Sequence, residues 1–135
     1  MRNLFVLLIL FCSSCQIQDK DTQLLADYLK QTFNQELIGG EHKYVLVSET
    51  ACTGCVSFVE DLCQNKPQPN TTYIMPRTLK DKLPHNNPQI LIDSTLRLNR
   101  LKFHQGNVCK IYMKNKVIDH IDVYNATDMT RLLKN

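Results

Sequence analysis

The stretch KYVLVSETACTGCVSFVEDLCQ, residues 43–64, decides the fold expected for this chain. Its first part, residues 43–49, is short, apolar and suited to a buried strand. Its second part, residues 54–64, has helical spacing. One face of that helix carries Cys55, Val59, Leu62 and Cys63. The sequence therefore predicts a buried strand that runs into an amphipathic helix, with Cys52 and Cys55 at the junction.

Alternating elements surround this unit. Helical spacing predicts one long helix and two short ones, at residues 22–33, 77–83 and 127–135. Apolar β-type runs predict four more strands, at residues 71–76, 88–93, 108–113 and 116–123. Residues 94–103 form an ambiguous link, and the last two strands lie close enough together for a tight hairpin. This order predicts an α/β fold with a central mixed β-sheet and helices on both faces.

The composition is that of a soluble globular domain and gives no reason to expect nucleic-acid binding. The chain has 135 residues, which suits one domain, and a formal net charge of +3. Its 16 lysines and arginines are scattered without a dense run or interleaved aromatic residues, so nucleic-acid binding is not expected. The sequence contains no Gly-rich phosphate loop, Ser-His-Asp set or paired catalytic carboxylates, and no cofactor is expected.

The N-terminus is predicted to be a targeting signal. Arg2 precedes an apolar run at residues 4–11, which is far shorter than the roughly 20 residues needed to span a bilayer. Two serines then precede Cys15, and this segment resembles a bacterial lipoprotein signal. The resemblance implies cleavage before Cys15 and lipidation of its thiol. An ordinary secretory signal is the alternative.

The predicted organisation follows from that cleavage point. It comprises a signal peptide at residues 1–14, a lipidated cysteine and tether at 15–21, and a folded domain at 22–135. The protein is expected in the bacterial cell envelope, anchored by its lipid and facing the periplasm, with the outer membrane favoured over the inner one.

Cys52 and Cys55 have the spacing of a redox pair. A cysteine at a helix N-terminus meets unpaired backbone N–H groups and the positive end of the helix dipole. Both favour the thiolate, so the pKa of Cys52 is expected to fall below the free value of about 8.5. Cys55 begins the buried face and is placed to resolve a mixed disulfide at Cys52. A structural disulfide is the alternative, although so small a loop constrains the unfolded chain little.

The other thiols have competing interpretations. Cys63 shares the apolar helix face and is predicted to be a core residue. Cys109 is predicted to be a core residue, with a third redox thiol and a metal ligand as alternatives. In the metal-binding hypothesis, Cys52, Cys55 and Cys109, with His104, form a thiolate-rich site for copper or zinc.

A strand leading into Cys-x-x-Cys at a helix start, with a hairpin and a final helix downstream, resembles the thioredoxin-like fold. Residues 92–123 are similar to the matching segment of exported TlpA/ResA-type thioredoxins. The family's cis-proline is replaced by sequence without proline at residues 106–109, and Ala51 stands where the family usually has tryptophan. The resemblance implies that Val108 and Cys109 line a partner groove. Glu49 is the nearest substitute for the family's acidic proton relay.

These observations predict an envelope thiol–disulfide oxidoreductase that acts on exported proteins. Cys52 attacks, Cys55 resolves and Glu49 assists proton transfer. An upstream electron donor or acceptor is required as a second partner. A metal-binding protein and a redox-inert, partner-binding lipoprotein are the alternatives.

Overall fold

A five-stranded sheet forms the middle layer of the protein. The structure is a computed structural model that describes residues 19–84, 86–103 and 106–134. Its strands are β1 (Glu41–Val47), β2 (Thr71–Pro76), β3 (Ile90–Asp93), β4 (Val108–Lys114) and β5 (Val117–Tyr124). Their order in the sheet is β3-β2-β1-β4-β5. β1, β2 and β3 run parallel to one another, whereas β4 is antiparallel to both β1 and β5.

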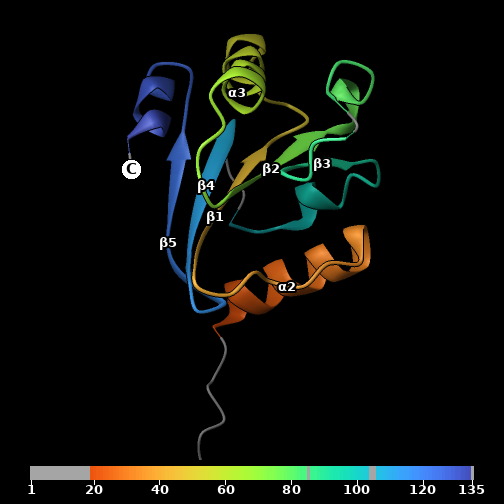
Figure 1. Cartoon of the computed structure of the whole chain (residues 1–135), viewed down its shortest axis with the longest axis vertical. Helices are drawn as coiled ribbons and strands as arrows, with labels where there is room; N and C mark the ends of the chain where they lie inside the picture. The colour runs from red at the N-terminus through yellow and green to blue at the C-terminus, as the bar shows by residue number, and fades with distance from the viewer. Residues whose placement is uncertain (1–18, 85, 104–105, 135) are drawn as a thin grey trace, which may run out of the picture.

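Helix α2 (Lys20–Phe33) covers one face of this sheet and lies below it in Figure 1. The Asp19 side chain caps its first turn, and Asn34 ends it in the left-handed conformation. The helix buries Leu25 and Leu29 completely, against a cluster that includes Leu46 of β1. The helix therefore forms because its apolar face has a sheet face to cover.

Helix α3 (Thr53–Asn65) covers the opposite face and lies above the sheet in Figure 1. Val59 and Leu62 are buried against Val45 and Val47 of β1. Burying each such side chain contributes about 1.5–3 kcal/mol. Successive residues of β1 thus pack on opposite sides, which is the two-residue period of a strand with both faces covered.

The short helical segments are 3₁₀ turns: η2 (Arg77–Leu79), η3 (Arg97–Arg100) and η4 (Met129–Leu133). The sequence predicted α-helices for the first and last of them, and this prediction was wrong. In η4, Met129 and Leu132 are both buried. A spacing of three residues matches the 3₁₀ period, so this short segment buries both side chains without a full α-helical turn.

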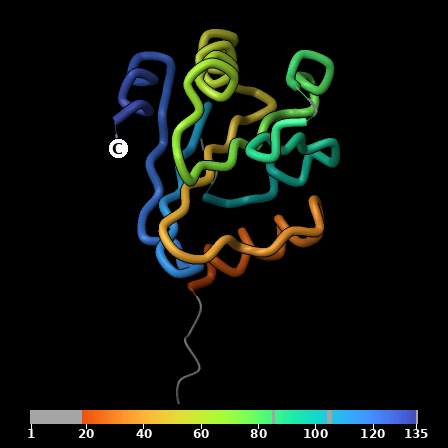
Figure 2. Tube along the Cα trace, in the orientation of Figure 1, coloured from red at the N-terminus to blue at the C-terminus, as the bar shows by residue number. Residues whose placement is uncertain are grey.

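The β4–β5 hairpin confirms the predicted tight turn, with Asn115 and Lys116 both at positive φ (52° and 66°). Two successive residues at positive φ define the type I′ turn preferred between twisted strands. Figure 2 traces this hairpin in blue beside the start of α2. The Ile118 N–H donates to Thr22 Oγ at 3.0 Å, which ties β5 to that helix.

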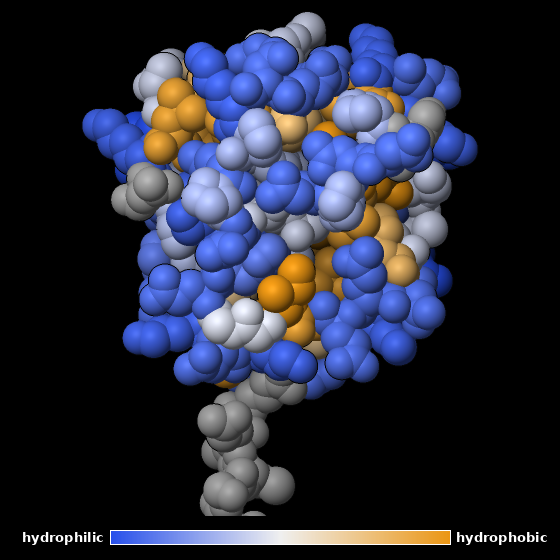
Figure 3. Space-filling view, in the orientation of Figure 1, coloured by the Kyte–Doolittle hydropathy of each residue, from blue (hydrophilic) through white to orange (hydrophobic). Residues whose placement is uncertain are grey.

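The architecture confirms the predicted α/β class, with a central mixed sheet and helices on both faces, and it is compatible with a thioredoxin-like fold. Within the described ranges, no helix has the length and apolar character needed to cross a membrane. The surface seen in Figure 3 is mostly hydrophilic, with separate apolar areas between polar side chains.

Candidate redox site

Cys52 and Cys55 are joined by a disulfide at the N-terminus of α3. Cys52 is the N-cap residue, with extended backbone angles (φ −61°, ψ 146°). Its sulfur accepts a hydrogen bond from the Cys55 N–H at 3.1 Å. Backbone N–H groups of the first helical turn lack partners within the helix, so this position favours negative charge on the Cys52 sulfur after reduction.

The two cysteines differ in their exposure to solvent. Cys52 is half-buried, whereas Cys55 is 0% exposed and belongs to the core cluster under α3. Thr53 and Gly54, which separate them, are exposed, and nothing lies within 4 Å of the position that a side chain on Gly54 would occupy. A partner thus has open space beside Cys52, while Cys55 is sheltered.

Asn107 lies against Cys52 and was missed in the sequence analysis. Its side-chain oxygen accepts a hydrogen bond from the Cys52 N–H at 2.9 Å. Its backbone oxygen accepts another from the Ser48 N–H at 3.0 Å. Asn107 therefore holds the segment before β4 against the segment between β1 and α3. The only sequence signal was an asparagine directly after Gly106 at the start of a strand.

Gly106 allows the chain to bring Asn107 against Cys52. It has φ +94°, which is unfavourable for residues with a Cβ. A Cβ built at this position would lie 2.9 Å from Cγ1 of Val123, closer than a side chain tolerates. The glycine is therefore required both by its backbone angle and by its contact with β5.

Glu49 lies just after β1, on the segment that leads to Cys52, but its carboxylate is hydrogen-bonded at the end of β2. Its Oε1 accepts from the Arg77 N–H at 2.8 Å, where β2 leads into η2. The carboxylate thereby links the ends of two neighbouring strands. A role of Glu49 in proton transfer remains a prediction.

Val108 and Cys109 do not form a groove through their side chains, because both are 0% exposed. Val108 packs with Cys55 in the cluster under α3, whereas Cys109 belongs to the cluster on the α2 face. The Cys109 side chain is therefore on the other side of the sheet from Cys55, because adjacent strand residues face opposite sides. The core role predicted for Cys109 is confirmed, and burial raises its thiol pKa to about 12.

Cys63 is also a core residue, as predicted, and is 1% exposed. Burial is the main reason that its pKa rises to about 11. A neutral thiol in apolar surroundings is a poor nucleophile at neutral pH, so Cys63 packs as a small apolar side chain.

The metal-binding hypothesis required Cys52, Cys55 and Cys109 to converge, and the sheet separates the third thiol from the other two. Within the part of the chain that the structure describes, no group of three or more potential ligands is placed to hold a metal ion. His104, the fourth ligand of that hypothesis, and Cys15, the predicted lipidation site, lie outside the described residues.

A second missed feature is the buried carboxylate of Asp93, at the end of β3, which is 1% exposed. It accepts hydrogen bonds from the backbone N–H and hydroxyl of Thr95, from the Leu98 N–H and from the Tyr28 hydroxyl. Burial alone would raise the pKa of Asp93, but these hydrogen bonds lower it overall. Asp93 thus fixes η3 and α2 at the edge of the sheet.

Comparison with known proteins finds no matching family model, no matching curated protein and no matching solved structure.

Proposed function

We propose that this protein exchanges thiols and disulfides with another exported protein through Cys52 and Cys55. The observation that carries the proposal is the disulfide at the head of α3, which joins one half-buried cysteine to one fully buried cysteine. Exchange requires an accessible sulfur that a partner attacks and a sheltered sulfur that leaves and returns. A permanent disulfide would need no such difference between its two sulfurs.

The proposed reaction starts from the disulfide. A partner thiolate attacks Sγ of Cys52, a partner–Cys52 bond forms, and Cys55 leaves as a thiolate that takes up a proton. A second partner thiolate then attacks the partner sulfur of that mixed disulfide and releases Cys52. The partner has lost two electrons and formed a disulfide, and the protein has become a dithiol.

The reverse direction uses the same steps. The Cys52 thiolate of the reduced protein attacks a partner disulfide, and Cys55 then attacks Cys52 Sγ and releases the partner as a dithiol. Either direction needs a second redox partner that restores the starting state. Glu49 is proposed to assist proton transfer, and Asn107 to hold Cys52 in place.

The proposed location follows from the N-terminal sequence. Cleavage before Cys15 and lipidation of its thiol would anchor the protein in the bacterial cell envelope, where its partners would be exported proteins. Labelling with a radioactive fatty acid tests this part separately: wild type should be labelled, and Cys15→Ser should not.

The reaction is tested by trapping mixed disulfides. The purified reduced protein is incubated with oxidised glutathione and a disulfide-containing protein, quenched with acid and analysed by mass spectrometry. Cys55→Ser should accumulate a mixed disulfide at Cys52, whereas Cys52→Ser should accumulate far less. Cys63→Ser is the matched control, because it removes a buried thiol of the same helix and should behave as wild type.

Absence of a mixed disulfide in Cys55→Ser would refute the proposal. A protein that also binds an exported partner unchanged after mutation of both cysteines would be the redox-inert binding module instead.

A further inference from the structure

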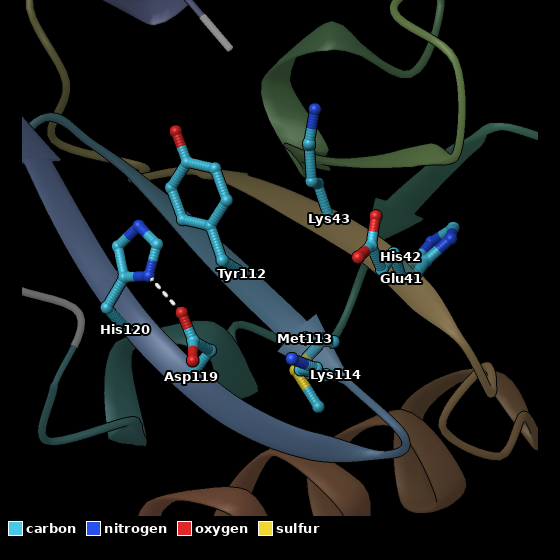
Figure 4. Close-up of a pocket in the computed structure, with 8 residues that line it drawn as sticks. All are labelled: Glu41, His42, Lys43, Tyr112, Met113, Lys114, Asp119 and His120. Carbon is cyan, nitrogen blue, oxygen red and sulfur yellow. Dashed lines mark hydrogen bonds and ion pairs between the residues drawn. The ribbon is translucent and has the colours of Figure 1, made fainter.

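A polar hollow lies on the α3 side of the sheet and extends from Lys43, near the start of β1, to Tyr124 at the end of β5. Strand register aligns Lys43 of β1 with Tyr112 of β4, and Tyr112 with His120 of β5. Lys43 lies two residues from Val45, which packs under α3, so this row is on the same face. Figure 4 shows Lys43 and Tyr112 rising from one side of the sheet, with His120 beside the tyrosine ring.

The row has a fixed geometry. The rings of Tyr112 and His120 are stacked, with centroids 4.0 Å apart. Nδ1 of His120 lies 2.6 Å from Oδ2 of Asp119. Nζ of Lys110 lies 5.1 Å from the centre of the Tyr112 ring. These contacts hold Tyr112 upright, so its hydroxyl is a fixed polar group on the wall of the hollow.

The part of the hollow that extends from this row to the end of η4 has a volume of about 490 Å³. Its walls carry three cationic side chains, Lys43, Arg131 and Lys134, and one carboxylate, Asp122. The Tyr124 hydroxyl donates to that carboxylate at 3.2 Å. Arg131 also pairs with Asp128 at 3.5 Å, on the exposed side of η4. The residues that line this part of the hollow therefore carry more positive than negative charge.

A fourth cation lies in the adjoining row of the same sheet face. Lys110 is 0% exposed, and its ammonium group donates to Gln68 Oε1 and to the Leu132 carbonyl, both at 3.2 Å. Burial and then the charge of Lys43 lower its pKa to about 8, while Asp122 acts in the opposite direction. Lys110, beneath the hollow, is thus close enough to Lys43 for the two charges to repel each other, and negative charge bound beside Lys43 would relieve that repulsion.

We propose that this hollow binds a phosphate group, held by Lys43, Arg131 and Lys134 and by the Tyr112 hydroxyl. Ammonium and guanidinium groups are the usual protein ligands of phosphate. The hollow is larger than the ion, so it has room for the molecule that carries the phosphate. That carrier is either a small phosphorylated compound or a phospholipid headgroup. The site is separate from the thiol chemistry and does not depend on it.

Calorimetric titration of the purified protein with inorganic phosphate tests the site at low ionic strength. Wild type should bind saturably in the millimolar range, and the double variant Lys43→Gln/Lys134→Gln should bind about tenfold more weakly. The matched control is Lys80→Gln/Lys82→Gln, which removes the same charge from exposed positions near η2 and should bind as wild type. Thermal unfolding of both variants checks that they are folded.

A second measurement needs no mutation. Phosphate should shift the amide NMR signals of Tyr112, His120 and Arg131 and leave those of Thr53 and Gly54 unchanged. Sedimentation with phosphatidylglycerol vesicles, compared with phosphatidylcholine vesicles, distinguishes the carriers: retention on the anionic vesicles indicates a headgroup, and phosphate binding without retention indicates a soluble compound. Absence of saturable binding, or equal weakening in the control pair, would overturn the proposal.

Discussion

The Cys52 N–H and the Asn107 side-chain oxygen form a hydrogen bond of 2.9 Å between residues 55 positions apart in the chain. The bond joins the N-cap of α3 to the residue that precedes β4. It fixes the backbone of the accessible cysteine relative to the sheet.

Asn107 is predicted to tune the redox pair. Asn107→Asp keeps the acceptor but adds negative charge beside Cys52, which disfavours the thiolate of the reduced protein. The Cys52 pKa should rise, and the reduction potential should become more negative by about 10–30 mV, since 30 mV corresponds to about one pKa unit. Equilibration with glutathione measures the potential. Asn99→Asp adds the same charge at an exposed position within η3 and should leave the potential unchanged. Equal potentials in all three proteins would contradict the role of Asn107.

Gly106→Ala should destabilise the protein by about 1–3 kcal/mol, because alanine is strained at φ +94° and its Cβ would press on Val123. Urea unfolding of the oxidised protein measures the change. Gly54→Ala is the control: it has no close neighbour at its Cβ position and lies in α3, so its free energy of unfolding should be unchanged or raised by up to about 1 kcal/mol. Similar losses in both variants would show that the environment of Gly106 is not restrictive.

Asp93 is predicted to make the protein sensitive to acid. Because its pKa is lower in the folded state than in the unfolded chain, the ionised carboxylate stabilises the fold above the unfolded-state pKa. That stabilisation is lost as the pH falls through the folded-state pKa. Asp93→Asn should cost about 1–3 kcal/mol at pH 7, since it places an amide against N–H donors. It should also flatten the decline of stability between pH 5 and 3.

Urea unfolding at pH 7, 5, 4 and 3 checks this prediction. Asp81→Asn is the control, because Asp81 is exposed. An unchanged pH profile in Asp93→Asn would contradict the role assigned to the buried carboxylate.

Lys116→Gly should stabilise the hairpin. Lys116 occupies the second central position of the turn at φ 66°, where a Cβ is unfavourable and glycine is preferred. Part of the gain is offset by the greater freedom of glycine in the unfolded chain, so an increase of about 0.5 kcal/mol in the free energy of unfolding is expected. Thermal unfolding measures it. Lys114→Gly, within β4, should destabilise the protein instead. A loss of stability in both variants would argue against the type I′ turn.

Local chemistry accounts for the part of the fold that the sequence predicted. The buried strand, the amphipathic α3 and the tight hairpin follow from the spacing of apolar and turn residues over a few positions. The cysteine pair at the head of α3 follows from the same pattern. The 3₁₀ form of η4 does not follow from that pattern, because so short a segment adopts the winding that buries Met129 and Leu132 against the core.

Strand register and long-range contacts decided the rest. Alternation along β4 meant that Val108 and Cys109 would face opposite sides, but only the assembled layers determined which one meets Cys55. The Asn107–Cys52 bond and the row of Lys43, Tyr112 and His120 join segments far apart in sequence. The sequence by itself thus determined the local elements and the cysteine pair. Only the tertiary structure placed Asn107 beside that pair and formed the polar hollow, since the residues of each come from separate segments of the chain.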